Sequence, residues 1–273
     1  MKKTLMALII ISVLSISAIP QVKSDWERDV LYGRVQHVRI ETLYLDEKGN
    51  PISKEGRALS SITSYDVSGN KIEDEGFANH GKLSGGKYTS RYDAQGNLIE
   101  SIHHGAFPVK TVYLYDGQEN PSDGDEVNWV NRINRDAQGR TKEIIYSAGD
   151  GLVINRQVFV YDSTGRVVEV STYNRQGSFA GQEIKTYNDA GRLISKVNGK
   201  KSGDRDYKKV TYSYDGRGNM IEEKEFNNRG LEAKTSNKYE FDSASNWIKE
   251  TAKYWRRGKD SYTVITYRII TYY

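Results

Sequence analysis

Residues 161–170 read YDSTGRVVEV, and this short stretch contains the pattern that decides the fold. Its first six residues recur in near copies along the chain, as YDVSGN from Tyr65, YDAQGN from Tyr92 and YDGRGN from Tyr214. An internal repeat of this kind indicates an architecture built from one repeated structural unit. The first question is whether the repeated acid serves chemistry or geometry.

Turn chemistry explains the repeated acid. In a D-x-x-G segment, Asp at the first position of a type I turn accepts hydrogen bonds from the backbone two residues on. The Gly takes a left-handed conformation that a side chain resists, and the pair forms a common hairpin connection. Asn188 replaces the acid in YNDAGR, as a turn allows. The pattern predicts structural turns at Asp66, Gly69, Asp93, Gly96, Asp162, Gly165, Gly191, Asp215 and Gly218.

The flanking residues predict strands. Aromatic residues alternate before the turns, as in KVTYSYD and RQVFVYD, and this two-residue period is typical of a strand with one aromatic face. Second turns, such as NRQGS from Asn174, lie between successive markers. We therefore predict an all-β fold, a long curved antiparallel β-meander of about 16–20 strands. Residues 262–273 predict a long final strand, residues 25–31 a short turn of helix, and whether the sheet closes stays open.

The N-terminal residues are typical of a secretory signal peptide. Lys2 and Lys3 precede an apolar stretch over residues 5–19 that is too short to predict a membrane span. We expect cleavage after Ser24, with Ala18 as the alternative, which leaves residues 25–273 as a single β-repeat domain. The chain has no Cys, so neither a lipoprotein anchor nor disulfides are expected. The sequence thus predicts an exported protein, periplasmic or extracellular, that does not span a membrane.

Charge and motifs exclude several classes of function. Removal of the three lysines before Asp25 lowers the formal net charge from +4 to +1, which favours neither nucleic acid nor an anionic membrane as a partner. Adjacent His103 and His104 would point to opposite faces of a strand, and no zinc motif is present. Ser84 lacks a nucleophile elbow, and the acidic residues 123–126 are typical of a solvated loop. We predict no catalytic residues, no metal and no cofactor.

The motif Y-D-x-x-G-[NR] resembles the YD repeats of bacterial RHS-type secreted proteins. The resemblance covers residues 46–246 and is best at Tyr65, Tyr92, Tyr161 and Tyr214. The segments LYGRVQHVRIET from Leu31 and RIITYY from Arg268 resemble the opening and closing parts of small exported proteins built from the same repeat. The resemblance implies a β-sheet scaffold without a catalytic motif. Large members of the family build a closed shell around a toxin domain, for which this chain is expected to be too short.

The tyrosines are the remaining candidates for a binding surface. Rows of aromatic side chains on a sheet stack on sugar rings or anchor a protein partner, although they also form a core when they pack together. The leading hypothesis is a non-enzymatic exported protein that binds a cell-surface glycan or protein or acts as an envelope scaffold. The alternatives are a carboxylate-dependent saccharide hydrolase and self-association through an open edge of the final strand. The candidate binding face consists of Tyr113, Tyr115, Tyr161, Tyr212 and Tyr214.

Overall fold

The computed structural model describes residues 24–54, 56–78, 82–119, 126–199 and 207–273. These residues form one short helix and a single sheet of 17 strands. The helix is α1 (Asp25–Arg28), and the strands are β1 (Val35–Leu45), β2 (Ala58–Tyr65), β3 (Lys71–Ala78), β4 (Lys82–Tyr92), β5 (Leu98–His104), β6 (Val109–Tyr115), β7 (Trp129–Arg135), β8 (Thr141–Ala148), β9 (Val153–Tyr161), β10 (Val167–Asn174), β11 (Phe179–Tyr187), β12 (Leu193–Asn198), β13 (Lys208–Tyr214), β14 (Met220–Asn227), β15 (Gly230–Phe241), β16 (Trp247–Arg256) and β17 (Lys259–Tyr272). No helix among these residues is long and apolar enough to cross a membrane.

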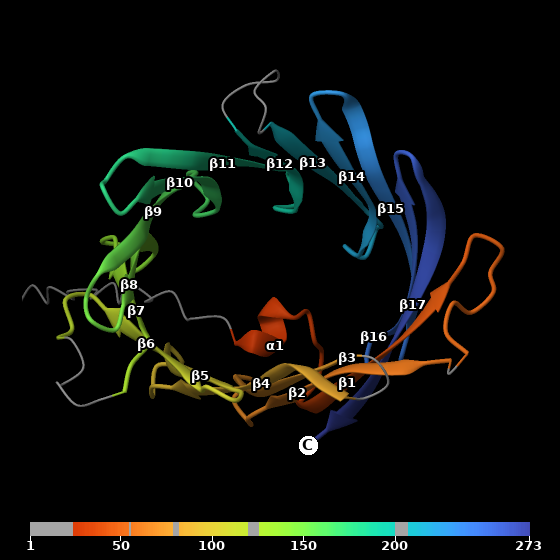
Figure 1. The fold of residues 1–273 in the computed structure, drawn as a ribbon, viewed down its shortest axis with the longest axis horizontal. Coiled ribbons are helices and arrows are strands. Elements are labelled where there is room, and N and C mark those ends of the chain that lie inside the picture. The colour runs from red at the N-terminus through yellow and green to blue at the C-terminus, as the bar shows by residue number, and fades with distance from the viewer. Residues whose placement is uncertain (1–23, 55, 79–81, 120–125, 200–206) are drawn as a thin grey trace, which may run out of the picture.

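The sheet closes into a barrel. Each described strand pairs with the next along the chain, and β17 pairs with β1 over most of its length, with Thr42 opposite Thr266 (Figure 1). The prediction of an all-β antiparallel meander is confirmed apart from one parallel pair, and the curved meander is corrected to a closed barrel. Closure satisfies the backbone groups of both end strands, which an open sheet would leave unpaired. The predicted open edge of the final strand is therefore wrong, because β1 and β16 occupy both of its edges.

One parallel pair makes closure of an odd number of strands possible. All neighbours are antiparallel except β6 and β7, which run in the same direction with Thr111 opposite Trp129. In the YDGQEN segment, Asp116 and Gly117 both have positive φ, and the Asp116 carboxylate accepts the backbone N–H of Arg135 instead of closing a hairpin. The chain therefore does not reverse into an adjacent antiparallel strand there. If β6 and β7 were antiparallel like the other neighbours, β1 and β17 would meet parallel rather than antiparallel.

Repeated turns shape one end of most hairpins. Asp162 Oδ1 accepts the N–H groups of Thr164 and Arg166 at 2.9 and 3.0 Å, and Gly165 N–H donates to the Asp162 carbonyl. The hydrogen bond from the Arg166 N–H lowers the pKa of the Asp162 carboxyl. Gly165 has φ +83°, in the region that side chains resist. The acid is thus a backbone acceptor in this turn.

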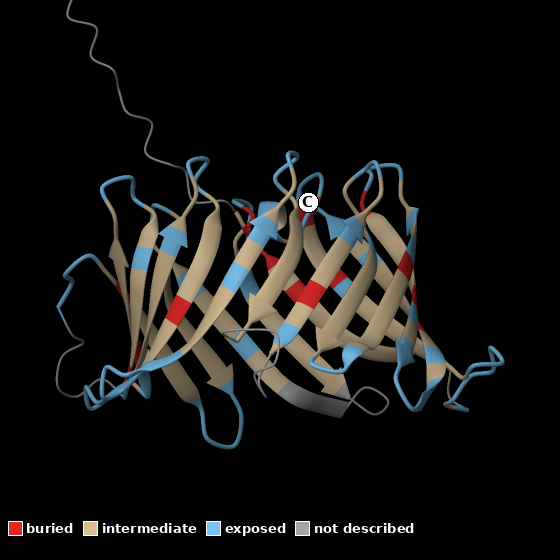
Figure 2. Cartoon of the chain, turned by 90° about the horizontal axis from the view of Figure 1, so that it is seen from above, coloured by how far each residue is buried: buried red, intermediate tan, exposed pale blue. Residues whose placement is uncertain are grey.

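Strand register divides the barrel into an inner and an outer face. α1 lies inside the ring in Figure 1 and is hydrogen-bonded to Tyr65 and Tyr92, so the face that carries these tyrosines is the interior. Because residues that pair across neighbouring strands lie on the same face of the sheet, the strand register assigns every other strand position to the inner or the outer face. Few side chains are fully buried (Figure 2), and the core cluster of Leu31, Val35, Val38 and Tyr65 lies where α1 meets the first strands.

Candidate functional site in the barrel interior

A ladder of tyrosines links successive hairpins on the inner face. The Tyr161 hydroxyl donates to the carbonyl of Thr141, 2.6 Å away in the preceding hairpin. A register shift at that end of the hairpin, between Asn134 and Arg135, accompanies this contact. The same contact recurs at Tyr92 to Lys71, Tyr115 to Leu98, Tyr187 to Val167 and Tyr214 to Leu193, at 2.7–3.0 Å. At these five positions the repeated tyrosine therefore joins its hairpin to the preceding one, whereas the Tyr65 hydroxyl donates to Asp29.

Arginines complete the ladder in the second half of the chain. Arg166 Nε donates to the Asp162 carboxylate of its own turn at 2.7 Å, and its guanidinium lies 5.0 Å from the ring centroid of Tyr187 in the next repeat. Arg140 lies 4.5 Å from the Tyr161 ring and Arg192 5.9 Å from the Tyr214 ring in the same manner. The Arg that follows Gly in the motif was visible in the sequence, but its second contact was not.

The predicted binding tyrosines lie on this inner face, in two kinds of environment. The hydroxyls of Tyr115, Tyr161 and Tyr214 are engaged by backbone carbonyls in the ladder. The Tyr113 hydroxyl lies 3.3 Å from that of Ser101, and Tyr212 is directly opposite Glu223. Their role as a ligand-binding face stays a prediction.

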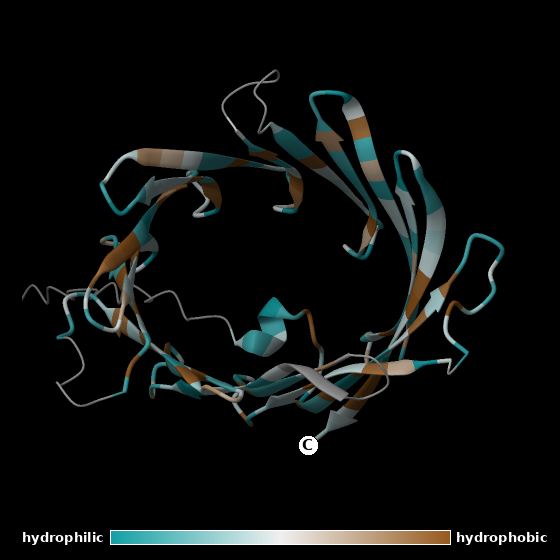
Figure 3. Cartoon of the chain, viewed as in Figure 1, coloured by the Kyte–Doolittle hydropathy of each residue, from teal (hydrophilic) through white to brown (hydrophobic). Residues whose placement is uncertain are grey.

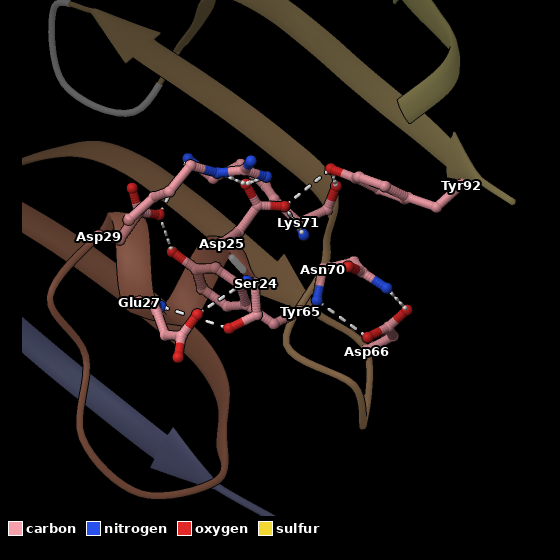
Figure 4. Close-up of polar contacts among 10 residues, drawn as sticks. Ser24, Asp25, Glu27, Asp29, Tyr65, Asp66, Asn70, Lys71 and Tyr92 are labelled. Atoms are coloured by element: carbon pink, nitrogen blue, oxygen red, sulfur yellow. Dashed lines mark hydrogen bonds and ion pairs between the residues drawn. The ribbon is translucent and has the colours of Figure 1, made fainter. Parts of the chain in front are cut away.

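Helix α1 is anchored to the inner wall by two carboxylates (Figure 4). Asp25 accepts hydrogen bonds from the Lys71 N–H at 2.7 Å and the Tyr92 hydroxyl at 2.8 Å, and it also pairs with Arg28. Asp29 accepts the Tyr65 hydroxyl at 2.6 Å. Burial alone would raise the pKa of Asp25, but these hydrogen bonds outweigh it and lower the pKa. Burial and the neighbouring carboxylates raise the pKa of both tyrosines.

Trp26 fixes the helix against the first repeated turn. Its indole N–H donates to the Val35 carbonyl at 2.8 Å, and its ring covers Gly69 so closely that a Cβ there would lie 2.6 Å from ring carbons. Ser24 caps the helix in a capping box with Glu27. Of the two predicted cleavage positions, only the one after Ala18 would keep this cap. The signal peptide itself falls in residues 1–23, outside the described residues.

A polar cleft of about 620 Å³ opens beside α1. Ser24 and Glu27 of the helix line it together with Asp66, Tyr92 and Asp93 of the neighbouring repeats. Asp66 and Asp93 already accept hydrogen bonds within their own turns, so they offer little free acceptor capacity. No group of three acidic or histidine side chains in the described part of the chain is arranged to hold a metal ion.

A second feature is a row of side chains across the interior of β13–β17, here named the interior row. Pairing places Tyr212, Glu223, Thr235, Tyr254 and Tyr262 next to one another in that order on five successive strands. The rings of Tyr254 and Tyr262 stack, with centroids 4.8 Å apart and planes inclined by 8°. Burial raises the pKa of Glu223, and the neighbouring Glu225 adds to the increase. Sequence reasoning identified Tyr212 of this row but missed the others, since cross-strand register was not known.

The remaining sequence candidates are not brought into one site. His103 packs against Tyr88 on the inner face, whereas His104 contacts Thr89 on the outer face. Ser84 lies on β4, where its side chain is not described, and residues 120–125 of the acidic loop fall outside the described residues.

Comparisons with known proteins give a fold likeness. No protein-family model and no curated protein matches the chain. A porin-like protein from Bacteroides uniformis aligns with 87% of this chain and 98% of its own, at 10% identity and a TM-score of 0.52. At that identity the likeness shows the fold alone, a β-barrel.

Two further matches are structures of TcdB2-TccC3-TEV and of TcdB2-TccC3 without its hypervariable C-terminal region. They align with 79% and 81% of this chain but only 16% and 15% of theirs, at 14% identity and TM-scores of 0.22 and 0.24. Likeness at that level carries no argument about fold or function. The resemblance to YD-repeat proteins is therefore not supported by the comparisons.

Proposed function

We propose that the protein is an exported, non-enzymatic barrel that works in an aqueous compartment of the cell envelope and binds a saccharide on its inner face. A cell-surface glycan fits the aromatic and hydroxyl groups that line the interior. The hairpins are, in this proposal, YD-type repeats that close into a barrel instead of a large shell. The observation that carries the proposed aqueous location is the distribution of charge on the outer face.

The outer face carries ion pairs on more than one side of the barrel, beside exposed apolar residues such as Val160, Ile184 and Ile269. Glu222 pairs with Lys224 on its own strand and with Lys234 on β15, with both N–O distances at 2.5 Å. On the other side of the barrel, Glu100 pairs with Lys110 and Arg91 at 3.0 and 3.4 Å. Hydrophilic and hydrophobic residues alternate irregularly around the ring (Figure 3). This surface supports contact with water.

A barrel inserted in lipid needs a different outer face. Such barrels carry an outward apolar band about 25 Å tall, and Lys or Arg at the centre of that band costs about 2–4 kcal/mol each. The ion pairs of Glu222 and Glu100 lie within strands, where that band would be. We therefore place the barrel in the periplasm or outside the cell, not within a membrane, although its fold resembles that of a porin-like protein.

The inner face supports saccharide binding. Tyr212, Tyr254 and Tyr262 offer aromatic surface on one wall, and Thr235 and Glu223 offer hydrogen-bonding groups between them. Tyrosine combines a large apolar ring with a polar tip, which suits the mixed apolar and hydroxylated faces of sugars. A hydrolase is the second candidate, because a glutamate with a raised pKa is the form that general-acid catalysis uses.

Two measurements test this function. In Triton X-114 phase separation, the mature protein should stay in the aqueous phase, with a membrane porin as the control for the detergent phase. Recovery in the detergent phase would contradict the proposed location. A glycan array should reveal at least one bound saccharide, and a parallel assay of reducing ends should show no turnover. Turnover would favour the hydrolase, and an array without any bound glycan would reject saccharide binding.

A further inference from the structure

The strand glutamates of the barrel differ in whether a cation neutralises them. On the inner face, Glu183 pairs with Lys185 at 3.1 Å and Glu225 with Lys208 at 2.9 Å. Most outer-face strand glutamates likewise have Lys or Arg partners, while Glu169 accepts the Ser171 hydroxyl instead. The paired ones are Glu73, Glu75, Glu100, Glu143, Glu222 and Glu240. Among the described residues, no ion pair is formed by Glu223, the single carboxylate of the interior row. Within the described part of the chain, no lysine or arginine is therefore paired with this carboxylate.

The two lysines that act electrostatically on Glu223 already form ion pairs with other glutamates. Lys196 and Lys208 act electrostatically on Glu223, but Lys196 pairs with Glu183 at 3.6 Å and Lys208 with Glu225. Glu250 also acts on Tyr254 of the row, and the Arg268 guanidinium stacks 3.6 Å from the Trp247 ring centroid without an ion pair to Glu250. An added positive charge at the row would thus meet the Glu223 carboxylate, which has no ion-pair partner among the described residues.

Aromatic groups flank this carboxylate on both sides. Tyr212 is its direct neighbour on β13, while the stacked Tyr254 and Tyr262 begin two strands away on β16. The row crosses four inter-strand spacings, which amounts to ~19 Å. Tyr262 remains 41% exposed, so part of this aromatic surface is open to solvent. An extended ligand can therefore lie along the row and contact both aromatic ends and the central acid.

We infer that the interior row binds a saccharide that carries a free amine. This inference rests on the proposed function and specifies its ligand class. The ammonium group pairs with the half-buried Glu223 carboxylate, because a charge-assisted hydrogen bond to an ionised carboxylate is stronger than one between neutral groups. The tyrosine rings stack on the sugar rings and attract the ammonium charge through their faces. An N-acetylated sugar of the same length retains the stacking but loses the charge.

Calorimetric titration of the mature protein with two oligosaccharides tests the ligand class. The probes are the glucosamine hexamer, which has free amines, and the N-acetylglucosamine hexamer, which is neutral. We expect the free-amine hexamer to bind at least tenfold more tightly. Because this comparison uses the unaltered chain, it does not depend on any variant folding correctly.

Two substitutions on β14 test the site. Glu223→Gln should weaken binding of the glucosamine hexamer about tenfold, since it removes the charge and keeps the shape. Glu222→Gln is the matched control, because it lies next in sequence on the opposite face, and it should change affinity less than twofold. Circular dichroism of both variants checks that the barrel forms.

The outcomes separate this inference from the proposed function. Equal affinity for the two hexamers, or equal effects of the two substitutions, would overturn the inference while saccharide binding stands. Binding of other glycans on the array, but of neither hexamer, would have the same meaning. A blank array together with two silent titrations would reject both the ligand class and the function.

Discussion

At the scale of single residues, the repeated motif combines a local and a distant contact. Asp162 accepts N–H groups two and four residues ahead, and this contact could be predicted from the sequence because turn chemistry is local. Tyr161, one position earlier, donates to Thr141 across a neighbouring hairpin. That contact could not be predicted, since it depends on which strands pair and in which register. The repeated Tyr-Asp dipeptide therefore makes one contact that the sequence predicts and one that depends on the fold.

Removal of one ladder hydroxyl should have a measurable cost. Tyr161→Phe should lower the free energy of unfolding by about 1 kcal/mol, because the Thr141 carbonyl loses its partner while the ring keeps its place. Tyr173→Phe is the control, since Tyr173 contacts Arg156 and Phe179 through its ring. Urea unfolding of both variants gives the comparison. Equal midpoints would show that the ladder hydrogen bond contributes nothing to stability.

At the scale of elements, the sequence predicted helix α1 but not its position inside the barrel. The sequence predicted a short helical turn over residues 25–31, and the structure forms a helix over Asp25–Arg28. Its position inside the barrel depends on Asp25 reaching Tyr92, which lies 67 residues away. Local pattern predicts the element, whereas docking depends on contacts distant in sequence. The candidate site follows the same rule, because Glu223 and Tyr254 become near neighbours only through strand pairing.

Two glycine substitutions distinguish the contribution of helix docking from the backbone strain of the turn. Gly69→Ala and Gly165→Ala both place a side chain at positive φ, at +86° and +83°, and so share a strain of about 1–2 kcal/mol. Only the Gly69 variant also drives a methyl group into Trp26, because nothing lies within 4 Å of the Cβ position at Gly165. Hydrogen exchange of residues 25–31 should therefore accelerate in Gly69→Ala and stay unchanged in Gly165→Ala. Equal exchange in the two variants would contradict the docking contact.

Acid should release the helix before it unfolds the barrel. The pKa of Asp25 is lowered in the folded protein, so its stabilising contribution is present above its unfolded-state value of about 3.8 and is lost as the pH falls through the folded-state value. Exchange of residues 25–31, corrected for the intrinsic rate, should increase between about pH 5 and about pH 2. Asp25→Asn should remove most of this dependence. A variant with the same pH profile as the native protein would assign the transition to another group.

At the scale of the whole molecule, antiparallel closure depends on the parallel pairing of β6 and β7. A meander of 17 strands with hairpins throughout would place β1 and β17 parallel, whereas the single parallel pair brings them together antiparallel. The YDGQEN segment from Tyr115 has Glu119 where the motif has Gly, but this difference alone does not predict a parallel strand pair. Strand type and approximate number were thus predictable, and closure was not, because it joins the two ends of the chain.

Cross-linking tests closure directly, because the native chain has no Cys. Leu43 on β1 lies opposite Ile265 on β17, where paired Cβ atoms stand about 4.5–5.5 Å apart, so a double Cys variant should form an intramolecular disulfide. The control joins Leu43→Cys with Ile145→Cys on β8, across the ring, and should stay reduced as a monomer (Figure 1). Non-reducing electrophoresis with intact-mass analysis distinguishes the products. Disulfide-linked dimers of the first variant, in place of the cross-linked monomer, would mean that β1 and β17 are open edges that pair between copies of the chain.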